Sequence, residues 1–233
     1  MKKKVLVTRK LLKENEDKLK KLFDVQLNEK DEIYSSDKII ELSKDCDGIL
    51  CAVTDQINKE LINRLSPSVK IIANFAVGYG NIDTTAARER NIVVTNTPEV
   101  LDDSTADVSI LLLLGASRKV LEARRAAELQ NWKWSADFML GKQMSNKRLG
   151  ILGMGRIGRA VAKRARGFNM EIHYHNRSQL SKDLEEGAIY HKTIKDLFSC
   201  SDFLSINCPA TKETNKIIHK ATLAFLPDNV VIG

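Results

Sequence analysis

The sequence predicts an α/β protein with two doubly wound, Rossmann-like parallel sheets. Three observations support this prediction. Apolar runs alternate with helical stretches through residues 1–98, a glycine fingerprint at 153–158 follows an apolar run, and a second alternation of the same kind continues to residue 233. Apolar residues make up 43% of the 233 residues, which is enough to fill two such cores.

The first 98 residues predict a flavodoxin-like sheet of five strands. The strands are expected at residues 5–8, 25–27, 48–53, 69–75 and 92–95. The helices between them are expected at 11–22, from a cap at Ser36 or Asp37 through Ser43, at 59–65, and at 84–90 behind a cap at Asp83. No glycine fingerprint follows the first strand, so this half is not expected to hold a dinucleotide.

A single long helix is predicted over residues 99–129, with Asp103 or Ser104 as its cap. Residues 110–114 are apolar on every side of that helix, which indicates burial between domains or between subunits. The loop after it, residues 131–147, carries the large apolar side chains of Trp132, Trp134, Phe138 and Met139. Such a loop needs a surface to cover, either the chain's own core or a second subunit.

The glycine fingerprint places Gly153, Gly155 and Gly158 between a strand at 149–152 and a helix at 156–166. The first glycine permits a tight turn, the second lets the backbone approach a pyrophosphate, and the third lets the helix pack close to the strand. The start of the helix offers N–H groups and a dipole that attract phosphates. A dinucleotide site is therefore predicted at this turn.

The rest of the second domain continues the alternation. Strands are predicted at 171–175, 202–206 and 230–232, and helices at 193–199 and 219–225. A complete dinucleotide domain usually has six strands, so residues 146–233 are expected to form an incomplete one.

The end of the second strand of this domain bears on the choice of cofactor. An NAD site usually has an acidic residue there, bonded to the ribose 2′-hydroxyl, whereas this sequence has Asn176, Arg177 and Ser178. A carboxylate would repel a 2′-phosphate, while Arg and Ser would bind one. NADP(H) is therefore favoured over NAD(H). In the competing interpretation, Arg177 is a solvated turn residue.

Composition and charge exclude several classes of protein. The longest apolar run, residues 110–116, cannot span a bilayer, and the polar start of the chain does not fit a signal peptide, so a cytoplasmic protein with no membrane partner is expected. The net charge of +7 raises nucleic acid as a partner, but the lysines are interspersed with acids, so none is expected. The cysteines have no paired CxxC spacing, which predicts no metal site and no disulfide framework: Cys46, Cys51, Cys200 and Cys208.

Several segments together carry a resemblance to a known family. They are ANFAVGYGNID at 73–83, NTP at 96–98, LDDSTAD at 101–107, LGILGMGRIG at 149–158, NRS at 176–178 and CPATKET at 208–214. Their order and spacing resemble those of the D-2-hydroxyacid dehydrogenases, and within that family the chain is similar to the glyoxylate/hydroxypyruvate reductases. The resemblance spans essentially the whole chain.

The resemblance implies a reaction and an organisation. It implies reduction of a small 2-keto acid, such as glyoxylate or hydroxypyruvate, by hydride from NAD(P)H. It further implies a substrate domain at 1–98, an interdomain helix and dimerisation loop at 99–145, and a partial NADP-binding domain at 146–233. A homodimer is expected through the 99–145 region.

The resemblance also implies roles for particular residues. The N–H groups of Val77 and Gly78 would hold the substrate carboxylate. Val53 and Thr54 would line the same pocket, with strand-end packing as the alternative. Contacts to the cofactor are implied for Thr105, Gly153, Gly155, Arg156, Ile157, Gly158, Asn176, Arg177, Ser178, Cys208, Pro209 and Thr214. For Thr105, hydrogen bonding at the helix start is a further role.

No catalytic residue is assigned. In the family an Arg, a Glu and a His act on the substrate, and all three would follow Gly233. The histidines present do not match the family's, and structural roles are expected for them: His173, His175, His191 and His219. The sequence is therefore expected to be a fragment that is poorly stable and inactive alone.

Other functions remain open at this point. A corepressor-like relative that binds NAD(P) without turnover is the main alternative. Oxidation of phosphonate or formate on the same scaffold ranks lower, and a nucleic-acid role lower still.

Overall fold

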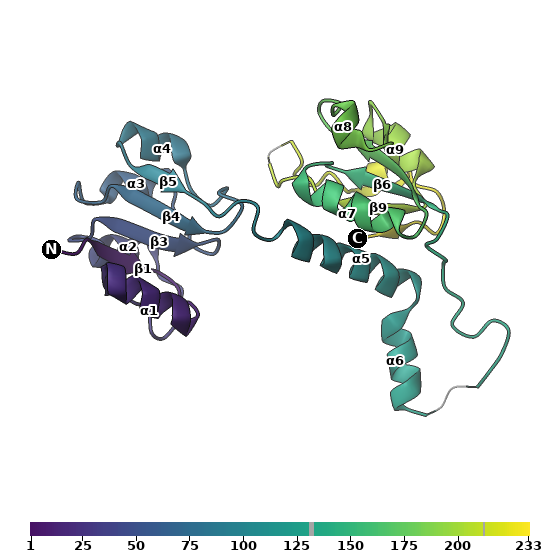
Figure 1. Cartoon of the computed structure of the whole chain (residues 1–233), viewed down its shortest axis with the longest axis horizontal. Helices are drawn as coiled ribbons and strands as arrows, with labels where there is room; N and C mark the ends of the chain where they lie inside the picture. The colour runs from purple at the N-terminus through teal and green to yellow at the C-terminus, as the bar shows by residue number, and fades with distance from the viewer. Residues whose placement is uncertain (131–132, 212) are drawn as a thin grey trace. The chain divides into compact units, whose positions relative to one another are not determined.

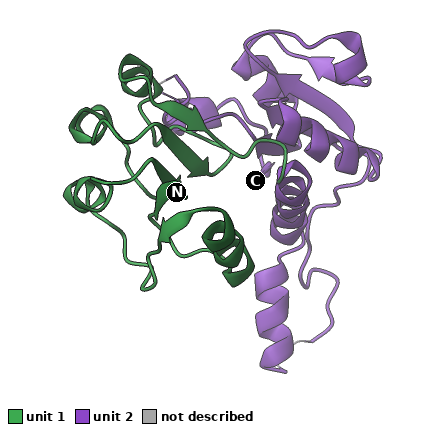
Figure 2. Cartoon of the chain, turned by 60° about the vertical axis from the view of Figure 1, so that its left-hand side comes forward, with its two compact units in different colours: residues 1–100 green, residues 101–233 purple. Residues whose placement is uncertain are grey.

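The computed structural model describes residues 1–130, 133–211 and 213–233, and it divides into two compact units at residues 1–100 and 101–233 (Figure 2). Each unit contains one parallel five-stranded sheet with helices between the strands. Two α/β units of this kind confirm the predicted fold class.

The first unit is built around strands β1 to β5 (Figure 1). The strands are β1 (Lys4–Val7), β2 (Asp24–Gln26), β3 (Gly48–Ala52), β4 (Ile71–Phe75) and β5 (Val93–Thr95). The helices are α1 (Lys13–Leu22), α2 (Ser36–Leu42), α3 (Lys59–Arg64) and α4 (Thr84–Glu89). The strand order β2-β1-β3-β4-β5 is the flavodoxin-like order, as predicted.

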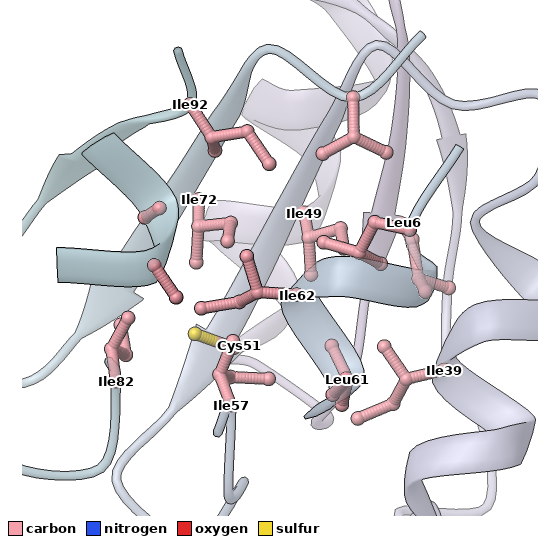
Figure 3. Close-up of a cluster of buried hydrophobic side chains, with 14 of the residues drawn as sticks. Leu6, Ile39, Ile49, Cys51, Ile57, Leu61, Ile62, Ile72, Ile82 and Ile92 are labelled. Carbon is pink, nitrogen blue, oxygen red and sulfur yellow. The ribbon is translucent and has the colours of Figure 1, made fainter. Parts of the chain in front are cut away.

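The core of the first unit forms where aliphatic residues occupy matched positions on neighbouring strands. Leu6 pairs with Ile49, and Ile49 pairs with Ile72, so the three form a row across β1, β3 and β4 (Figure 3). Ile39 of α2 and Ile62 of α3 belong to the same buried cluster, and each of these side chains is at most 1% exposed. Burial of each such side chain stabilises the unit by about 1.5–3 kcal/mol.

The second unit contains the other sheet, in the order β10-β9-β6-β7-β8. Its strands are β6 (Arg148–Leu152), β7 (Glu171–His175), β8 (Ile189–Tyr190), β9 (Phe203–Ile206) and β10 (Val231–Ile232). Its helices are α5 (Asp102–Ser117), α6 (Val120–Glu128), α7 (Arg156–Arg166), α8 (Lys182–Glu185), α9 (Ile194–Cys200) and α10 (Lys220–Leu223). Counted from β6, this is the 3-2-1-4-5 order of a dinucleotide-binding fold.

Helix α5 packs along α7 in the core of the second unit. Ala106 and Leu113 of α5 belong to the same buried cluster as Val161 and Ala165 of α7. Arg164 adds ion pairs from α7 to Asp103 and Asp107 of α5. The side of α5 that packs on α7 therefore buries part of the apolar segment 110–114 inside the second unit.

The single helix predicted over 99–129 is wrong, because it is two helices separated at Lys119. Lys119 has a left-handed backbone with φ of 52°. The carbonyl of Ser117 accepts a hydrogen bond from Lys142 N, at 2.8 Å, which draws the end of α5 toward a later loop. The predicted caps Asp103 and Ser104 are also wrong, since the cap is Leu101 and the Ser104 hydroxyl donates to its carbonyl.

Smaller differences concern one cap and two short elements. Helix α2 is capped by Ser35, which accepts from Lys38 N, rather than by Ser36 or Asp37. Helix α8 and strand β8 were not predicted, because they have only four and two residues.

Among the residues of the loop after α6, Trp132 lies outside the described residues, while Trp134 is exposed. No helix in the described part of the chain is long and apolar enough to cross a membrane.

Candidate functional site

A cavity of about 560 Å³ opens in the second unit at the carboxyl ends of β6, β7 and β9. The strand order reverses between β6 and β9, and ligands of doubly wound sheets bind at such reversals. Three groups of residues line the cavity, one at the end of each strand: 152–155, 175–178, and 207–209 with 211 and 213–214. Apolar residues from other elements complete the wall: Leu180, Ile194 and Ile217.

The glycine turn after β6 has the properties its spacing predicts. Gly153 has φ of 96°, and a Cβ there would lie 2.6 Å from the backbone nitrogen of Cys208. A Cβ on Gly158 would collide with the carbonyl oxygen of Gly153, so helix and turn touch directly. A Cβ on Gly155 would meet no described atom within 4 Å. A side chain would therefore collide with the protein at Gly153 and Gly158, whereas at Gly155, which lines the cavity, it would meet open space.

Asn176 holds the glycine turn in place. Its side-chain Oδ1 accepts a hydrogen bond from Met154 N, at 2.7 Å, across the two strand ends. The carbonyl of Asn176 accepts from the Tyr190 hydroxyl at 3.3 Å. The sequence placed Asn176 at the ribose, and this anchoring of the turn is a role that it did not indicate.

Arg177 and Ser178 are exposed and line the same cavity as Glu213. The hydroxyl of Thr211 lowers the pKa of Glu213, and the positive charge of Arg177 contributes to the shift. The charge of Arg177 is the smallest of these contributions, after the hydrogen bond from Thr211. The segment after β9 is held by Thr214, whose hydroxyl donates to the carbonyl of Pro209 at 2.6 Å.

The cavity brings together most of the residues predicted to contact a cofactor. They are Gly153, Gly155, Asn176, Arg177, Ser178, Cys208, Pro209 and Thr214. Burial raises the pKa of the Cys208 thiol, which suits a packed side chain rather than a reactive one. His175 and Asn207 also line the cavity and were not predicted. Their position at strand ends was the signal that could have identified them.

Four predicted cofactor residues lie outside the lining of this cavity. Arg156 forms an ion pair with Asp102 at 3.2 Å. Ile157 packs against the buried core of the unit, and Gly158 is buried. Thr105 lies in the first turns of α5, where its carbonyl accepts from the Ser109 hydroxyl. Arg156, Ile157 and Gly158 directly follow the turn at the start of α7, and none of the four residues lines the cavity.

The first unit contains the loop predicted to hold a carboxylate, residues 76–83. Asn74 Nδ2 donates to the carbonyl of Gly78, and Asn96 Nδ2 donates to the carbonyl of Val77, each at 2.8 Å. Within the described part of the chain, the N–H groups of Val77 and Gly78 have no hydrogen-bond partner. A Cβ on Gly78 would meet no described atom within 4 Å, so there is open space beside this glycine.

The strand-end residues Val53 and Thr54 lie in the turn after β3 of the same unit. Val53 is 59% exposed, and the Thr54 hydroxyl accepts from Arg9 Nη1 at 2.7 Å. Next to them, the buried carboxylate of Asp55 accepts from the Thr8 hydroxyl at 2.6 Å, which ties β1 to this turn. The sequence did not indicate the structural roles of Asn74, Asn96 and Asp55, because each depends on a distant partner.

Each of the four histidines has a structural partner. His219 caps α10, and His175 Nδ1 lies 2.9 Å from the carbonyl of His191. His173 and His191 contact each other directly. Burial lowers the pKa of His191, and the neighbouring His173 adds to the effect, so its ring is neutral near pH 7.

Comparison with known proteins adds to this geometry. Residues 110–232 match the family model for the NAD-binding domain of D-isomer specific 2-hydroxyacid dehydrogenases. A glyoxylate reductase of Thermococcus litoralis is 37% identical, with all of this chain and 71% of the relative aligned. A glycerate dehydrogenase of Hyphomicrobium methylovorum is 34% identical over 99% of this chain and 73% of the relative.

A solved structure is similar over nearly the same extent. The crystal structure of a glyoxylate reductase from Paecilomyes thermophila has a TM-score of 0.87 to this chain and is 34% identical. The match covers 99% of this chain and 72% of that one.

Proposed function

Since the chain belongs to the D-isomer specific 2-hydroxyacid dehydrogenases, a family of oxidoreductases, we propose that it binds NADP(H) in the cavity of its second unit and a small 2-keto acid on the 76–83 loop of its first. The reaction would reduce hydroxypyruvate to the D-2-hydroxy acid, or glyoxylate to its 2-hydroxy acid, which is achiral. When bound, the nicotinamide supplies or accepts the hydride. The names of the relatives, glyoxylate reductase and glycerate dehydrogenase, support acids of this size.

The observation that carries the proposal is the convergence of three loops on one cavity. The turn at Gly155 leaves room for a pyrophosphate at the start of α7, a helix of 11 residues whose first N–H groups attract phosphate. The loop after β7 would hold the adenosine ribose, and the lining residues at 208–209, 211 and 213–214 would cover the ribose and phosphates. Arg156, Ile157 and Gly158 would support the pyrophosphate from the helix start, and Thr105 would approach the nicotinamide.

Preference for NADP(H) over NAD(H) rests on the side chains after β7. Asn176 offers an amide where a carboxylate would repel a 2′-phosphate, and its Oδ1 is already used by the glycine turn. Arg177 and Ser178 are exposed at the lining of the cavity, where they can donate to phosphate oxygens.

The substrate proposal rests on the free N–H groups of Val77 and Gly78. Their carbonyls are fixed by Asn96 and Asn74, so the two amides are held in place for a carboxylate without reorganisation. Val53 and Thr54 would line the side of the same surface. No side chain of the described residues is assigned as the catalytic acid.

A titration with each coenzyme tests the cofactor proposal. The Arg177→Ala variant should bind NADPH about 10- to 100-fold more weakly than the wild type, because two charge-assisted hydrogen bonds to the 2′-phosphate are lost. Its affinity for NADH should change little. Fluorescence or calorimetric titration of the purified protein measures both constants.

The matched control is Lys192→Ala, which removes the same charge from an exposed residue that does not line the cavity. This variant should bind both coenzymes as the wild type does. Equal losses of NADPH and NADH affinity in Arg177→Ala would contradict the NADP assignment. Absence of binding of either coenzyme to folded wild-type protein would overturn the proposed function.

A further inference from the structure

Four side chains at the edge of the second sheet form a connected cluster. They come from β7, from the residue that follows β8, and from the last residue of α9: Glu171, His173, His191 and Cys200. His173 is only 6% exposed, while His191 and Cys200 are partly exposed. None of the four lines the cofactor cavity. The cluster is therefore separate from the site described above, with a buried end and an accessible one.

The contacts fix which nitrogen atoms carry protons. Glu171 Oε1 lies 2.5 Å from His173 Nε2, and a carboxylate can only accept, so Nε2 carries the proton. The other ring nitrogen of His173, Nδ1, then has a free lone pair directed at His191 Nε2, 2.8 Å away. A carboxylate that holds one imidazole nitrogen and directs the other inward is the arrangement found behind metal-bound histidines.

The distances between the three inner atoms are close to those of a metal site. With Zn–N bonds of about 2.0–2.1 Å and Zn–S of about 2.3 Å, tetrahedral ligands lie roughly 3.3 Å apart for two nitrogens and roughly 3.6 Å apart for nitrogen and sulfur. His191 Nε2 lies 3.6 Å from Cys200 Sγ. His173 Nδ1, His191 Nε2 and Cys200 Sγ all lie within 4.8 Å of one another. To surround an ion, the two nitrogens, now 2.8 Å apart, would separate slightly and the sulfur would turn toward them.

We propose that His173 Nδ1, His191 Nε2 and the Cys200 thiolate bind one zinc ion, with Glu171 orienting the His173 ring. Two imidazoles and a thiolate form a donor set that suits zinc and not a hard cation such as magnesium. On binding, Cys200 releases its proton to solvent, and the proton of His191 moves from Nε2 to Nδ1. The fourth position of the ion is left for water.

The proposed ion would fasten the edge of the sheet. Strand β8 has only two residues, and it pairs with β7 at His173 to Ile189 and at Tyr174 to Tyr190. The three ligands join β7, the chain after β8 and the end of α9, so the metal would link elements that are otherwise held by few contacts. The sequence did not predict this site because its ligands have no CxxC or related spacing and meet only in the folded unit.

Cobalt and zinc titrations of the tag-free, reduced protein test the proposal. Cobalt(II) should bind one ion per chain and give a thiolate-to-cobalt charge-transfer band, which zinc then removes by displacement. The Cys200→Ser variant should lose the band, and both Cys200→Ser and His191→Gln should bind zinc about tenfold more weakly or worse. Zinc should also raise the melting temperature of the wild type more than that of either variant.

Cys208→Ser is the matched control, because Cys208 is also partly exposed but lies in the cofactor cavity. This variant should keep the cobalt band and the zinc affinity of the wild type. The proposal is overturned if folded wild-type protein gives no cobalt–thiolate band. It is equally overturned if the band persists in Cys200→Ser, or disappears in Cys208→Ser.

Discussion

The three glycines of the fingerprint divide their work between folding and binding. Gly153 and Gly158 are required by the protein itself, since a side chain at either would collide with backbone atoms. Gly155 has an ordinary backbone, with φ of −78°, and open space where a side chain would point. The N-cap preference for glycine over alanine accounts for part of this choice, and a ligand that approaches the backbone gives a further reason.

This difference predicts opposite outcomes for two alanine substitutions. Gly155→Ala should leave the free energy of unfolding within about 1 kcal/mol of the wild type, because alanine is only a weaker helix cap than glycine. It should nevertheless weaken coenzyme binding about tenfold or more, since its methyl group occupies the space of the pyrophosphate. Gly153→Ala should destabilise the protein by about 2 kcal/mol or more, through a strained backbone and a collision with Cys208.

Denaturant unfolding and coenzyme titration, each done on both variants, check the prediction. Full coenzyme affinity in Gly155→Ala would show that this glycine has no ligand to accommodate. Wild-type stability in Gly153→Ala would show that the turn relaxes more easily than its contacts with Cys208 suggest.

At the scale of single residues, sequence reasoning identified groups whose role depends on local spacing. The glycine spacing predicted the turn, and the residue types after β7 predicted that Arg177 lies at the cofactor site, where it lines the cavity. It did not identify Asn74, Asn96 or the turn-anchoring role of Asn176, because an amide side chain can bond almost anywhere. Which carbonyl or N–H it meets is settled only when distant segments pack together.

Helix α5 has two apolar faces, and only one of them is buried in the second unit. One face, with Ala106, Ile110 and Leu113, is buried in the second unit. The other carries Val108, Leu111 and Leu112, which are 53–66% exposed. Their spacing of three and four residues forms one stripe, and such a stripe normally meets a partner. We propose that a second copy of the chain covers it in a homodimer.

A charge placed on the stripe should prevent this association. Leu111→Asp should raise the dimer dissociation constant at least about 100-fold, because an unpaired carboxylate would be buried at the interface. Size-exclusion chromatography with light scattering over a micromolar concentration series measures it. Leu12→Asp, the same change at another exposed leucine in the first unit, should leave the dimer intact. A wild-type chain that stays monomeric throughout would refute the homodimer.

At the scale of elements, periodicity predicted the long helices and the strands of both sheets. The break between α5 and α6 was missed because helical propensity continues through Lys119. What ends α5 is the bond from Lys142 N to the Ser117 carbonyl, which belongs to tertiary structure. Strand β8 was missed for a different reason, because its two residues are too few to show an alternation of apolar and polar side chains.

For the whole molecule, the fold class followed from simple rules. Regular alternation of strands and helices favours a parallel sheet, and right-handed crossovers then restrict the strand orders to a few. The two sheets realise two of them, the flavodoxin-like order and the dinucleotide-binding order. The family resemblance assigned substrate to one and coenzyme to the other, which periodicity alone could not do.

Both units depend on carboxylates that ionise more readily when folded. In the first, Arg9 and the N–H of Lys10 lower the pKa of Asp31 to about 2. In the second, Lys182, Gln179 and the Tyr174 hydroxyl lower the pKa of Glu185 to about 2. In the unfolded chain the pKa of Asp and Glu is about 4, which is above the folded value, so ionisation of these two groups stabilises the folded state. That contribution is complete above about pH 5 and is lost as the pH falls toward 2.

The urea midpoint of the protein should therefore fall steeply between about pH 5 and pH 2. The net charge of +7 becomes more positive over the same range, and repulsion adds to the loss. Glu185→Gln should have a lower midpoint than the wild type at pH 7, because three donors lose a charged acceptor. The gap should close as the pH falls through about 2, where folded Glu185 becomes protonated. The control is Asp183→Asn, a change at an exposed residue of α8, and its urea midpoint should equal that of the wild type at every pH. If the difference in midpoint between Glu185→Gln and the wild type stays constant with pH, the assignment of the pH dependence to Glu185 is contradicted.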